Sequence, residues 1–462
     1  MLGIGMWVLM LAGSGVIHIY LWRRLVRDTT RPGTLGRRLG TVAVVVSAVA
    51  APGTRIVTPM LDPSDDGGGR WVAWPGYTLI GVLLYLLLAL AVLEVPRVLV
   101  LRRLRRAEQA TGREPAEPVA VAADPASAEL AATELAGAGA PMTRVRAAQV
   151  PASDVPATPR TAGDGAASAP GGASTAPAAG PLMGRRLLIG RAVGALAGAT
   201  ALGTVGHGMS VALGDPRIKR VPIPLSKVNE RLAGLRIAVV SDIHLGPMLG
   251  RAHTERVVRM INGLQADLVT IVGDLADGTA AQLGPAVRPL RNLESRYGSF
   301  FVTGNHEYLY DGVEDWLDEM RAVDVRPLVN ERVEIEHNGA FLDLAGVEDL
   351  AGEETGRGPD LEGTLSGRDT SRPVVLLAHQ PVFAEEAARH GVDLQLSGHT
   401  HGGQMFPLNA VTAMANPVTA GLGTVDDTTL YVTSGVGFFG PPVRVGAPAD
   451  ISLLELRTRS GG

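Results

Sequence analysis

The chain has 462 residues, of which 46% are apolar and 19% are charged, and its formal net charge is −4. Soluble domains carry about 25% charged residues, so part of this chain is expected to lie in lipid. No nucleic acid is expected as a partner, because that binding relies on an excess of positive charge. The absence of cysteine excludes disulfides, iron–sulfur clusters and cysteine-type zinc sites, so any metal must be held by His, Asp, Glu or Asn.

Residues 1–106 are predicted to form a membrane domain with three transmembrane helices, at about 2–22, 40–61 and 71–95. The first contains no Asp, Glu, Lys or Arg, and the third is apolar until Glu94. Each is therefore long enough to cross a bilayer. Arg55 interrupts the second segment, and we expect its side chain to reach the membrane surface at the outer end of the helix.

Arginines predict the orientation of these helices. They cluster after the first span and again after the third, at Arg23, Arg24, Arg27, Arg31, Arg37 and Arg38, and at Arg97, Arg102, Arg103, Arg105 and Arg106. Because basic loops stay in the cytoplasm, both clusters should face it. The second segment must then cross the membrane, and the loop with Asp62, Asp65 and Asp66 is external.

Residues 107–184 consist largely of Ala, Pro, Gly, Ser and Thr without one aromatic residue, which predicts a disordered cytoplasmic linker. Residues 185–214 form either a fourth transmembrane helix or a twin-arginine-like anchor. Two arginines at 185–186 and the small residues at 210–212 resemble an export signal and its cleavage site, whereas the basic flank equally suits an uncleaved anchor. Either interpretation places residues 221–462 on the extracytoplasmic side of the plasma membrane.

From residue 221 onward, short apolar runs alternate with amphipathic stretches. The runs typical of buried strands are 237–240, 268–272, 299–303, 374–378 and 394–397. Helical spacing occurs between them, at 251–264 and 382–390. This alternation predicts an α/β fold.

Every one of these predicted strands is followed by residues that can bind a metal. In chain order they are Asp242-Ile243-His244, Gly273-Asp274, Gly304-Asn305-His306-Glu307, His379 and Gly398-His399-Thr400-His401. Because the carboxyl ends of strands in an α/β sheet meet at one rim, we expect these side chains to converge. Alternation along a strand would place Asp242 and His244 on the same side, and likewise His399 and His401.

Taken in this order, the motifs resemble those of the calcineurin-like metallophosphoesterase superfamily, whose pattern is D-x-H, G-D, G-N-H-[ED], H and G-H-x-H. The resemblance covers residues 235 to about 456. The sequences at 398–404 and 441–448 are similar to the membrane-associated phosphodiesterase-type branch. The resemblance implies a four-layer α-β-β-α sandwich, here preceded by transmembrane helices.

The resemblance also implies two divalent metal ions, for which Mn, Fe and Zn are all suitable. The implied ligands form two sets joined by a bridging Asp274: Asp242, His244 and His401, and Asn305, His379 and His399. In this family a hydroxide that bridges the two metals attacks phosphorus, and His306 is implied as the general acid that protonates the leaving oxygen. Asp274, Asn305 and His306 are thus the expected catalytic residues.

The expected substrate is a phosphodiester or pyrophosphate at the outer membrane face, such as a lipid head group or an envelope precursor. Two other functional classes stay open. In a membrane-anchored sensor or scaffold the phosphoesterase fold would only bind, but the intact ligands and His306 argue against it. A transporter is disfavoured because the four spans are nearly free of charged side chains. The sequence makes no prediction of oligomeric state.

Other polar residues receive simpler interpretations. Three histidines outside the motifs are predicted to lie at the surface: His253, His337 and His390. His18 and His207 lie in apolar spans, where we expect neutral imidazoles bonded within the helix bundle. Arg444 either contacts substrate phosphate or forms a structural ion pair, and Glu307 orients His306 or a metal ligand.

Overall fold

The computed structural model describes residues 4–111, 181–310 and 312–459. Contacts divide the chain into two units, residues 1–98 with 185–462, and residues 99–184. The predicted linker, 107–184, lies for the most part outside the described residues.

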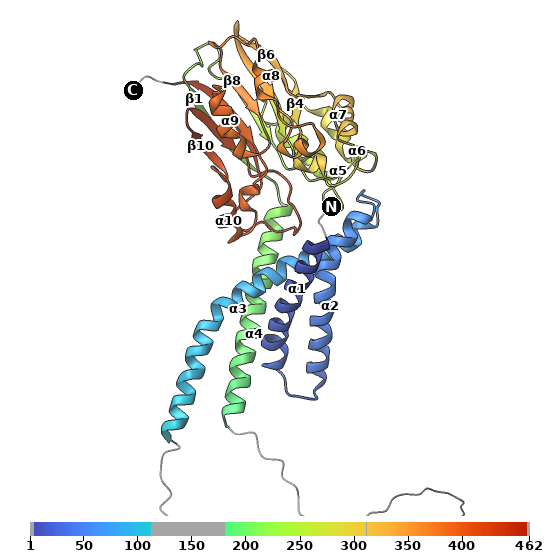
Figure 1. Ribbon diagram of the computed structural model, residues 1–462, viewed down its shortest axis with the longest axis vertical. Coiled ribbons are helices and arrows are strands. Elements are labelled where there is room, and N and C mark those ends of the chain that lie inside the picture. Colours follow the sequence, from blue (N-terminus) through green and yellow to red (C-terminus); the bar gives the residue numbers. More distant parts are fainter. Residues whose placement is uncertain (1–3, 112–180, 311, 460–462) are drawn as a thin grey trace, which may run out of the picture. The chain divides into compact units, whose positions relative to one another are not determined.

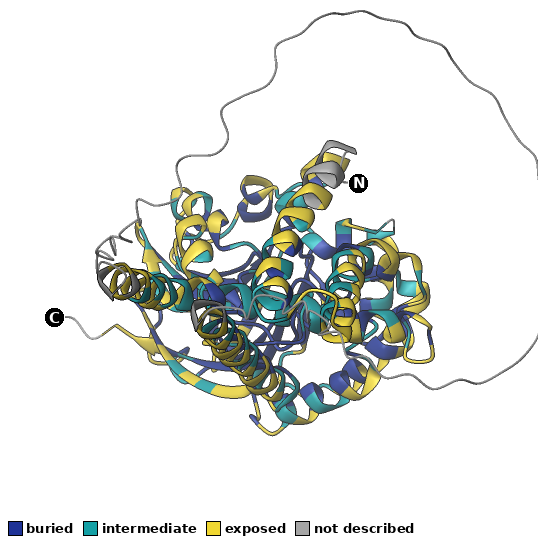
Figure 2. Cartoon of the chain, turned by 90° about the horizontal axis from the view of Figure 1, so that it is seen from below, coloured by how far each residue is buried: buried dark blue, intermediate teal, exposed yellow. Residues whose placement is uncertain are grey.

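Four long helices of the described chain precede the C-terminal domain: α1 (Ile4–Leu21), α2 (Leu35–Val57), α3 (Gly69–Thr111) and α4 (Pro181–Leu213). Three segments are long and apolar enough to cross a membrane, at 35–60, 69–107 and 184–213. They contain most of the predicted second, third and fourth spans. Helix α1 covers most of the predicted first span, whose residues 2 and 3 lie outside the described chain. Figure 2 shows mainly exposed and intermediate residues on these helices, as expected for surfaces that face lipid.

The arginine-rich flanks of these helices meet one another. Arg24, in the π-helix Trp22–Arg27 that follows α1, donates a hydrogen bond of 2.7 Å to Glu94 of α3. Arg191 of α4 donates to the carbonyl oxygen of Thr29 at 3.0 Å. The basic segments that the sequence assigns to one side of the membrane therefore lie at the same end of the helices.

The opposite helix ends contact the C-terminal domain. Asp65, in the loop between α2 and α3, accepts a hydrogen bond of 3.1 Å from the backbone N–H of Arg251. Arg256 donates to the carbonyl oxygen of Leu213, the last residue of α4, at 2.8 Å. The acidic loop and the C-terminal domain thus lie at the same end of these helices.

The C-terminal domain contains two six-stranded sheets (Figure 1). The first has the order β1 (Arg217–Leu225), β12 (Asp450–Thr458), β2 (Arg236–Val240), β3 (Leu268–Val272), β4 (Ser299–Val302) and β5 (Val325–Pro327). The second has the order β10 (Gly421–Val425), β11 (Thr428–Val432), β9 (Leu394–Ser397), β8 (Val374–Leu377), β7 (Ala340–Gly346) and β6 (Glu331–His337). The five predicted strands are confirmed as β2, β3, β4, β8 and β9.

Alternation along the strands builds the layers. Ile237 and Val239 of β2 pack between the two sheets, whereas Ala238 and Val240 face the helices on the outside. The helices on the outer face of the first sheet are α5 (Arg251–Asn262), α6 (Ala280–Val287) and α7 (Val313–Ala322). The second sheet is covered by α8 (Leu361–Leu365) and α9 (Ala384–Arg389). The predicted α-β-β-α sandwich is therefore confirmed, and α10 (Leu408–Ala415) is an additional helix with no buried residue.

The prediction of surface positions is wrong for two of the three histidines. His253 is only 4% exposed, because it shares the buried face of α5 with Val257 and Ile261 at a spacing of four residues. Burial and the nearby Arg256 lower the pKa of His253 to about 3. His337 is also buried, and its Nδ1 lies 2.9 Å from the hydroxyl of Tyr297.

The other three histidines outside the site differ in burial. His390 is partly exposed and His207 is exposed. His18 is buried, and its Nδ1 lies 2.8 Å from the carbonyl oxygen of Ser14 one helical turn earlier. This contact agrees with the predicted imidazole bonded within the helices.

Candidate metal centre

The motif residues come together at the carboxyl ends of the strands. In the first sheet β2, β3 and β4 are parallel neighbours, and in the second β8 and β9 are parallel neighbours. Three groups of side chains place their possible ligand atoms within 4.8 Å of one another. They are Asp242, His244 and His401; Asp274, His379 and His399; and His244, Asp274 and His306.

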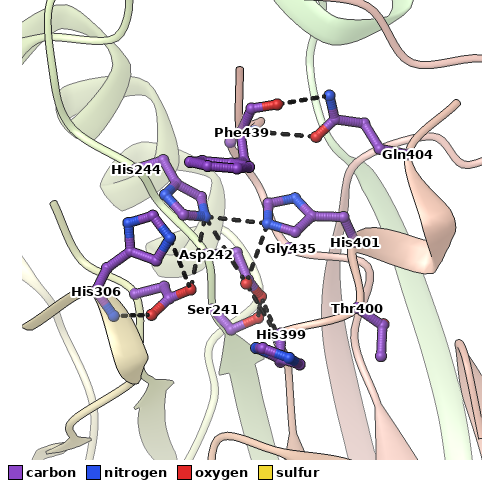
Figure 3. Close-up of polar contacts among 12 residues, drawn as sticks. Ser241, Asp242, His244, His306, His399, Thr400, His401, Gln404, Gly435 and Phe439 are labelled. Atoms are coloured by element: carbon purple, nitrogen blue, oxygen red, sulfur yellow. Dashed lines mark hydrogen bonds and ion pairs between the residues drawn. The ribbon is translucent and has the colours of Figure 1, made fainter. Parts of the chain in front are cut away.

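The first group combines two imidazoles and a carboxylate (Figure 3). Nε2 of His244 and Nε2 of His401 are 3.0 Å apart. Oδ1 of Asp242 lies 3.3 Å from His401 Nε2 and 3.9 Å from His244 Nε2. All three residues are buried, so solvent does not screen the negative charge of Asp242.

The second group surrounds Asp274. Oδ2 of Asp274 lies 3.2 Å from Nε2 of His379. Next to it, Nδ1 of His399 lies 2.8 Å from Oδ1 of Asn305. The structure therefore brings together every predicted ligand of the second ion, including the amide oxygen of Asn305.

The donor atoms of both groups fit a metal cation. Nδ1 of His379 lies 2.8 Å from the carbonyl oxygen of Val272, and since a carbonyl can only accept, Nδ1 must carry a proton. Nε2 of His379 is buried without a hydrogen-bond partner among the described residues, and it faces the carboxylate of Asp274. A neutral imidazole would place a lone pair against a carboxylate here, an arrangement that a cation between them would stabilise. Burial alone would lower the pKa of His379, but Asp274 raises it well above the usual value, so the site attracts positive charge.

Five predicted ligands have left-handed backbone conformations: Asp242, His244, Asp274, His399 and His401, with φ of 51°, 47°, 53°, 69° and 51°. Non-glycine residues rarely adopt this region, and such strain concentrates at functional sites. We expected alternation along a strand to place both residues of each Asp-x-His or His-x-His pair on the same side. That explanation is wrong. These residues lie beyond the strand ends, and His399 and His401 belong to different groups.

Two glycines of the motifs are required by close contacts. Gly273 has a φ of 79°, and a Cβ at this position would overlap the ring of His379. A Cβ at Gly398 would overlap Ser241 and the carboxylate of Asp242. Glycine at both positions lets the ligand loops pack against each other.

Asp277 is a residue of this site that the sequence analysis missed. Its Oδ1 lies 2.9 Å from Nδ1 of His244 and 2.7 Å from Nδ1 of His306. Burial would lower the pKa of His306, but Asp277 and Asp274 together raise it to about 9. The signal in the sequence that could have identified Asp277 is a second carboxylate in the same loop, three residues after Asp274.

Glu307 holds the backbone of the loop that carries Asp274. Its carboxylate accepts hydrogen bonds from the N–H groups of Asp274, Leu275 and Gly304 at 3.1, 2.8 and 2.6 Å. Burial raises the pKa of Glu307 to about 7. Glu307 was expected to orient either His306 or a metal ligand, and these contacts favour orientation of the predicted ligand Asp274.

Arg444 has neither of its predicted roles. The side chain is fully buried, and its guanidinium donates to backbone carbonyl oxygens of His401, Ser434, Gly435, Gly437 and Ala447. Burial lowers its pKa to about 10. Arg444 therefore fixes the turn of His401, and no carboxylate of a described residue lies at ion-pair distance from it.

A cavity of about 390 Å³ opens beside these residues, and His244, Asp277 and His306 form its polar side. The ring of Phe439 lies next to them, with its centroid 5.9 Å from that of His244 and 5.1 Å from that of His306. Figure 3 shows Phe439 beside the His244 ring. The cavity is therefore lined by His244 of the first group and by His306.

Comparisons with known proteins agree with this geometry. A family model described as calcineurin-like phosphoesterase matches residues 235–403. A Bos taurus protein named "Transmembrane protein with metallophosphoesterase domain" is 43% identical over 262 residues, which cover 54% of this chain and 59% of the relative. An uncharacterized metallophosphoesterase from Helicobacter pylori is 38% identical over 258 residues, which cover 55% of this chain and 68% of the relative.

A solved calcineurin-like phosphoesterase from Bacillus subtilis has 18% identity and a TM-score of 0.30, covering 48% of this chain and 91% of its own. The chain thus spans 59% of the length of the Bos taurus relative and 68% of the Helicobacter pylori relative. The matched region contains all five motifs completely. The chain belongs to the calcineurin-like metallophosphoesterases.

Proposed function

We propose that this chain hydrolyses a phosphodiester or pyrophosphate at the outer face of the plasma membrane, with two divalent ions of Mn, Fe or Zn and with His306 as the general acid. Membership of the family implies hydrolysis of phosphoric esters in general. The observation that carries the proposal is the position of Asp274. Its Oδ2 lies 3.2 Å from Nε2 of His379 and 3.8 Å from Nε2 of His244, between the two ligand groups.

The residues divide into two ligand sets and one acid. Asp242, His244 and His401 would hold one ion, and Asn305, His379 and His399 the other, with Asp274 shared. Bound in these positions, the two ions would supply a reactive water and neutralise the charge on the phosphoryl oxygens.

His306 is suited to protonate the leaving oxygen. Asp277 fixes its Nδ1, so its Nε2 is directed toward Asp274, 4.0 Å from Oδ2. The imidazole also lines the cavity. A proton on Nε2 is therefore available to a phosphoester bound beside the ligand groups.

The domain arrangement supports action at the outer membrane face. Residues 1–106 and 185–214 would anchor the chain, and 107–184 would link them in the cytoplasm. The acidic loop contacts the phosphoesterase domain through Asp65, whereas the arginine-rich flanks lie at the other helix ends. Because basic flanks stay in the cytoplasm, residues 221–462 would lie outside it.

The test uses the full-length chain in lipid nanodiscs with added Mn²⁺. We expect metal-dependent hydrolysis of bis(4-nitrophenyl) phosphate, lost in Asp274→Asn and retained in His390→Gln, which changes a histidine outside the site. The sensor or scaffold alternative would be favoured if the chain binds metal but does not hydrolyse any of three substrates: this diester, 4-nitrophenyl phosphate and inorganic pyrophosphate.

A further inference from the structure

The membrane part of the chain forms one wall of the cavity beside His306. The cavity is lined on one side by His244, Asp277 and His306. The residues that the membrane part contributes are Arg55, Thr58, Pro59, Leu61, Pro63 and Tyr77. They lie where α2 ends and α3 begins, so the catalytic pocket is completed by segments at the membrane surface.

Arg55 is the cation of this wall. Its guanidinium carbon lies 6.0 Å from the centroid of the Phe439 ring, which in turn packs against His306. Among the described residues Arg55 forms no ion pair and no hydrogen bond, whereas Arg70, near the start of α3, donates to the carbonyl oxygen of Asp65 at 3.1 Å. An arginine within a candidate membrane span has a high cost, and one that lies at a cavity with no ion-pair or hydrogen-bond partner among the described residues is suited to bind an anionic ligand.

Apolar side chains also line the cavity, beside polar ones such as Thr58, Tyr77 and Tyr310. Leu61 and Pro63 line it from the membrane side, and Met248, Leu249 and Phe438 line it from the phosphoesterase domain. The cavity therefore offers a charged position at Arg55, a charged position at His306 and apolar side chains from both parts of the chain. An amphiphile with two anionic groups matches this distribution.

We infer that Arg55 is a substrate-binding residue, and that the site takes amphiphilic phosphoesters that carry a second anionic group beside the scissile phosphoryl group. The scissile group lies at His306, the second anionic group lies at Arg55, and the apolar part leaves toward the ends of α2 and α3. This inference rests on the proposed function, because it assigns the substrate class of the same site.

Three probes separate these features in the full-length chain. Farnesyl pyrophosphate has an apolar part and a second anionic group, inorganic pyrophosphate lacks the apolar part, and bis(4-nitrophenyl) phosphate lacks the second anionic group. We expect the wild-type chain to have a lower KM for farnesyl pyrophosphate than for inorganic pyrophosphate. Equal values would overturn the amphiphilic part of the inference.

The variants are Arg55→Gln, Arg55→Lys and the matched control Arg70→Gln. Loss of a charge-assisted hydrogen bond should raise KM for farnesyl pyrophosphate by about tenfold to a hundredfold in Arg55→Gln. The KM for bis(4-nitrophenyl) phosphate should change little. Arg55→Lys keeps the charge and should recover most of the loss, which separates binding from misfolding. Equal KM values in Arg55→Gln and Arg70→Gln would refute the role of Arg55.

Calorimetric binding of farnesyl pyrophosphate to the metal-stripped chain gives a second readout that needs no turnover. Affinity should fall in Arg55→Gln and not in Arg70→Gln. Binding that depends on Arg55 in a chain that hydrolyses none of the probes would contradict the proposed function and leave Arg55 as a ligand-binding residue. Binding that does not depend on Arg55 would contradict the inference even in an active enzyme.

Discussion

Oδ1 of Asp277 lies 2.7 Å from Nδ1 of His306 and sets the direction of the imidazole. The same oxygen is 2.9 Å from Nδ1 of His244. One carboxylate therefore orients both the proposed acid and a proposed ligand. Residues of this kind act through the groups that they hold.

Asp277→Asn should lower kcat by about tenfold to a hundredfold, the range seen when a partner of a metal ligand is removed. Asparagine keeps the size of the side chain but loses the charge that holds both imidazoles. Steady-state kinetics with bis(4-nitrophenyl) phosphate measure the effect, and Asp318→Asn, on the exposed face of α7, is the control. A normal kcat would show that Asp277 has only a structural role.

Asp274→Asn and His306→Ala should fail in different ways. The first removes the shared carboxylate, so we expect loss of bound metal as well as of turnover. The second should keep metal and lose roughly 10²- to 10⁴-fold in kcat, with a smaller loss for esters whose leaving group is acidic. Elemental analysis and a series of nitrophenyl esters distinguish the two. An equal loss across the whole series would exclude His306 as the acid.

Hydrolysis should invert the configuration at phosphorus. In the described part of the site no serine or threonine hydroxyl is hydrogen-bonded to a histidine, and the chain has no cysteine, so no covalent phosphoenzyme is expected. A single in-line attack by water inverts the phosphorus centre. Hydrolysis of a substrate chiral at phosphorus in labelled water provides the measurement. Net retention would point to a second displacement and refute direct attack.

His253 should make the fold sensitive to acid. In the unfolded chain a histidine titrates near pH 6.5, whereas burial and Arg256 lower the pKa of folded His253 to about 3. Between these values only the unfolded state takes up the proton, so stability is lost as pH falls, by up to about 1.4 kcal/mol per pH unit. His253→Gln should show a smaller drop in melting temperature between about pH 7 and about pH 5. His390→Gln should behave like the wild type, and identical drops in all three proteins would contradict this assignment.

The topology can be read with single cysteines, since the chain contains none. Gly68→Cys and Ser366→Cys, both at exposed positions, should react with an impermeant thiol reagent on intact cells. Thr34→Cys, exposed between α1 and α2, should react only after permeabilisation. Labelling of Thr34→Cys on intact cells would reverse the predicted orientation.

The local sequence determined the strands, the ligand types and their order. Buried strands such as β2 and β3 are mostly apolar, and β2 is followed by Ser241 and β3 by Gly273. Asp242, Asp274 and His379 follow the ends of β2, β3 and β8 after one intervening residue, so the rim of the sheets could be predicted before the fold was known. The long apolar helices could also be predicted from the sequence, because a lipid bilayer requires long apolar segments.

Only the tertiary structure decided which residues face one another across the chain. The family resemblance implied that His399 and His401 belong to different groups, but the left-handed turns that separate them are not predicted by alternation along a strand. The role of Asp277 depends on the packing of the β3 and β4 loops, and that of Arg444 on carbonyl groups of His401 and of the connection between β11 and β12. Arg55 looked like an interruption of a span, and only its position 6.0 Å from Phe439 placed it at the catalytic cavity. Such contacts join residues of different loops or elements, and the pattern of one segment carries no information about them.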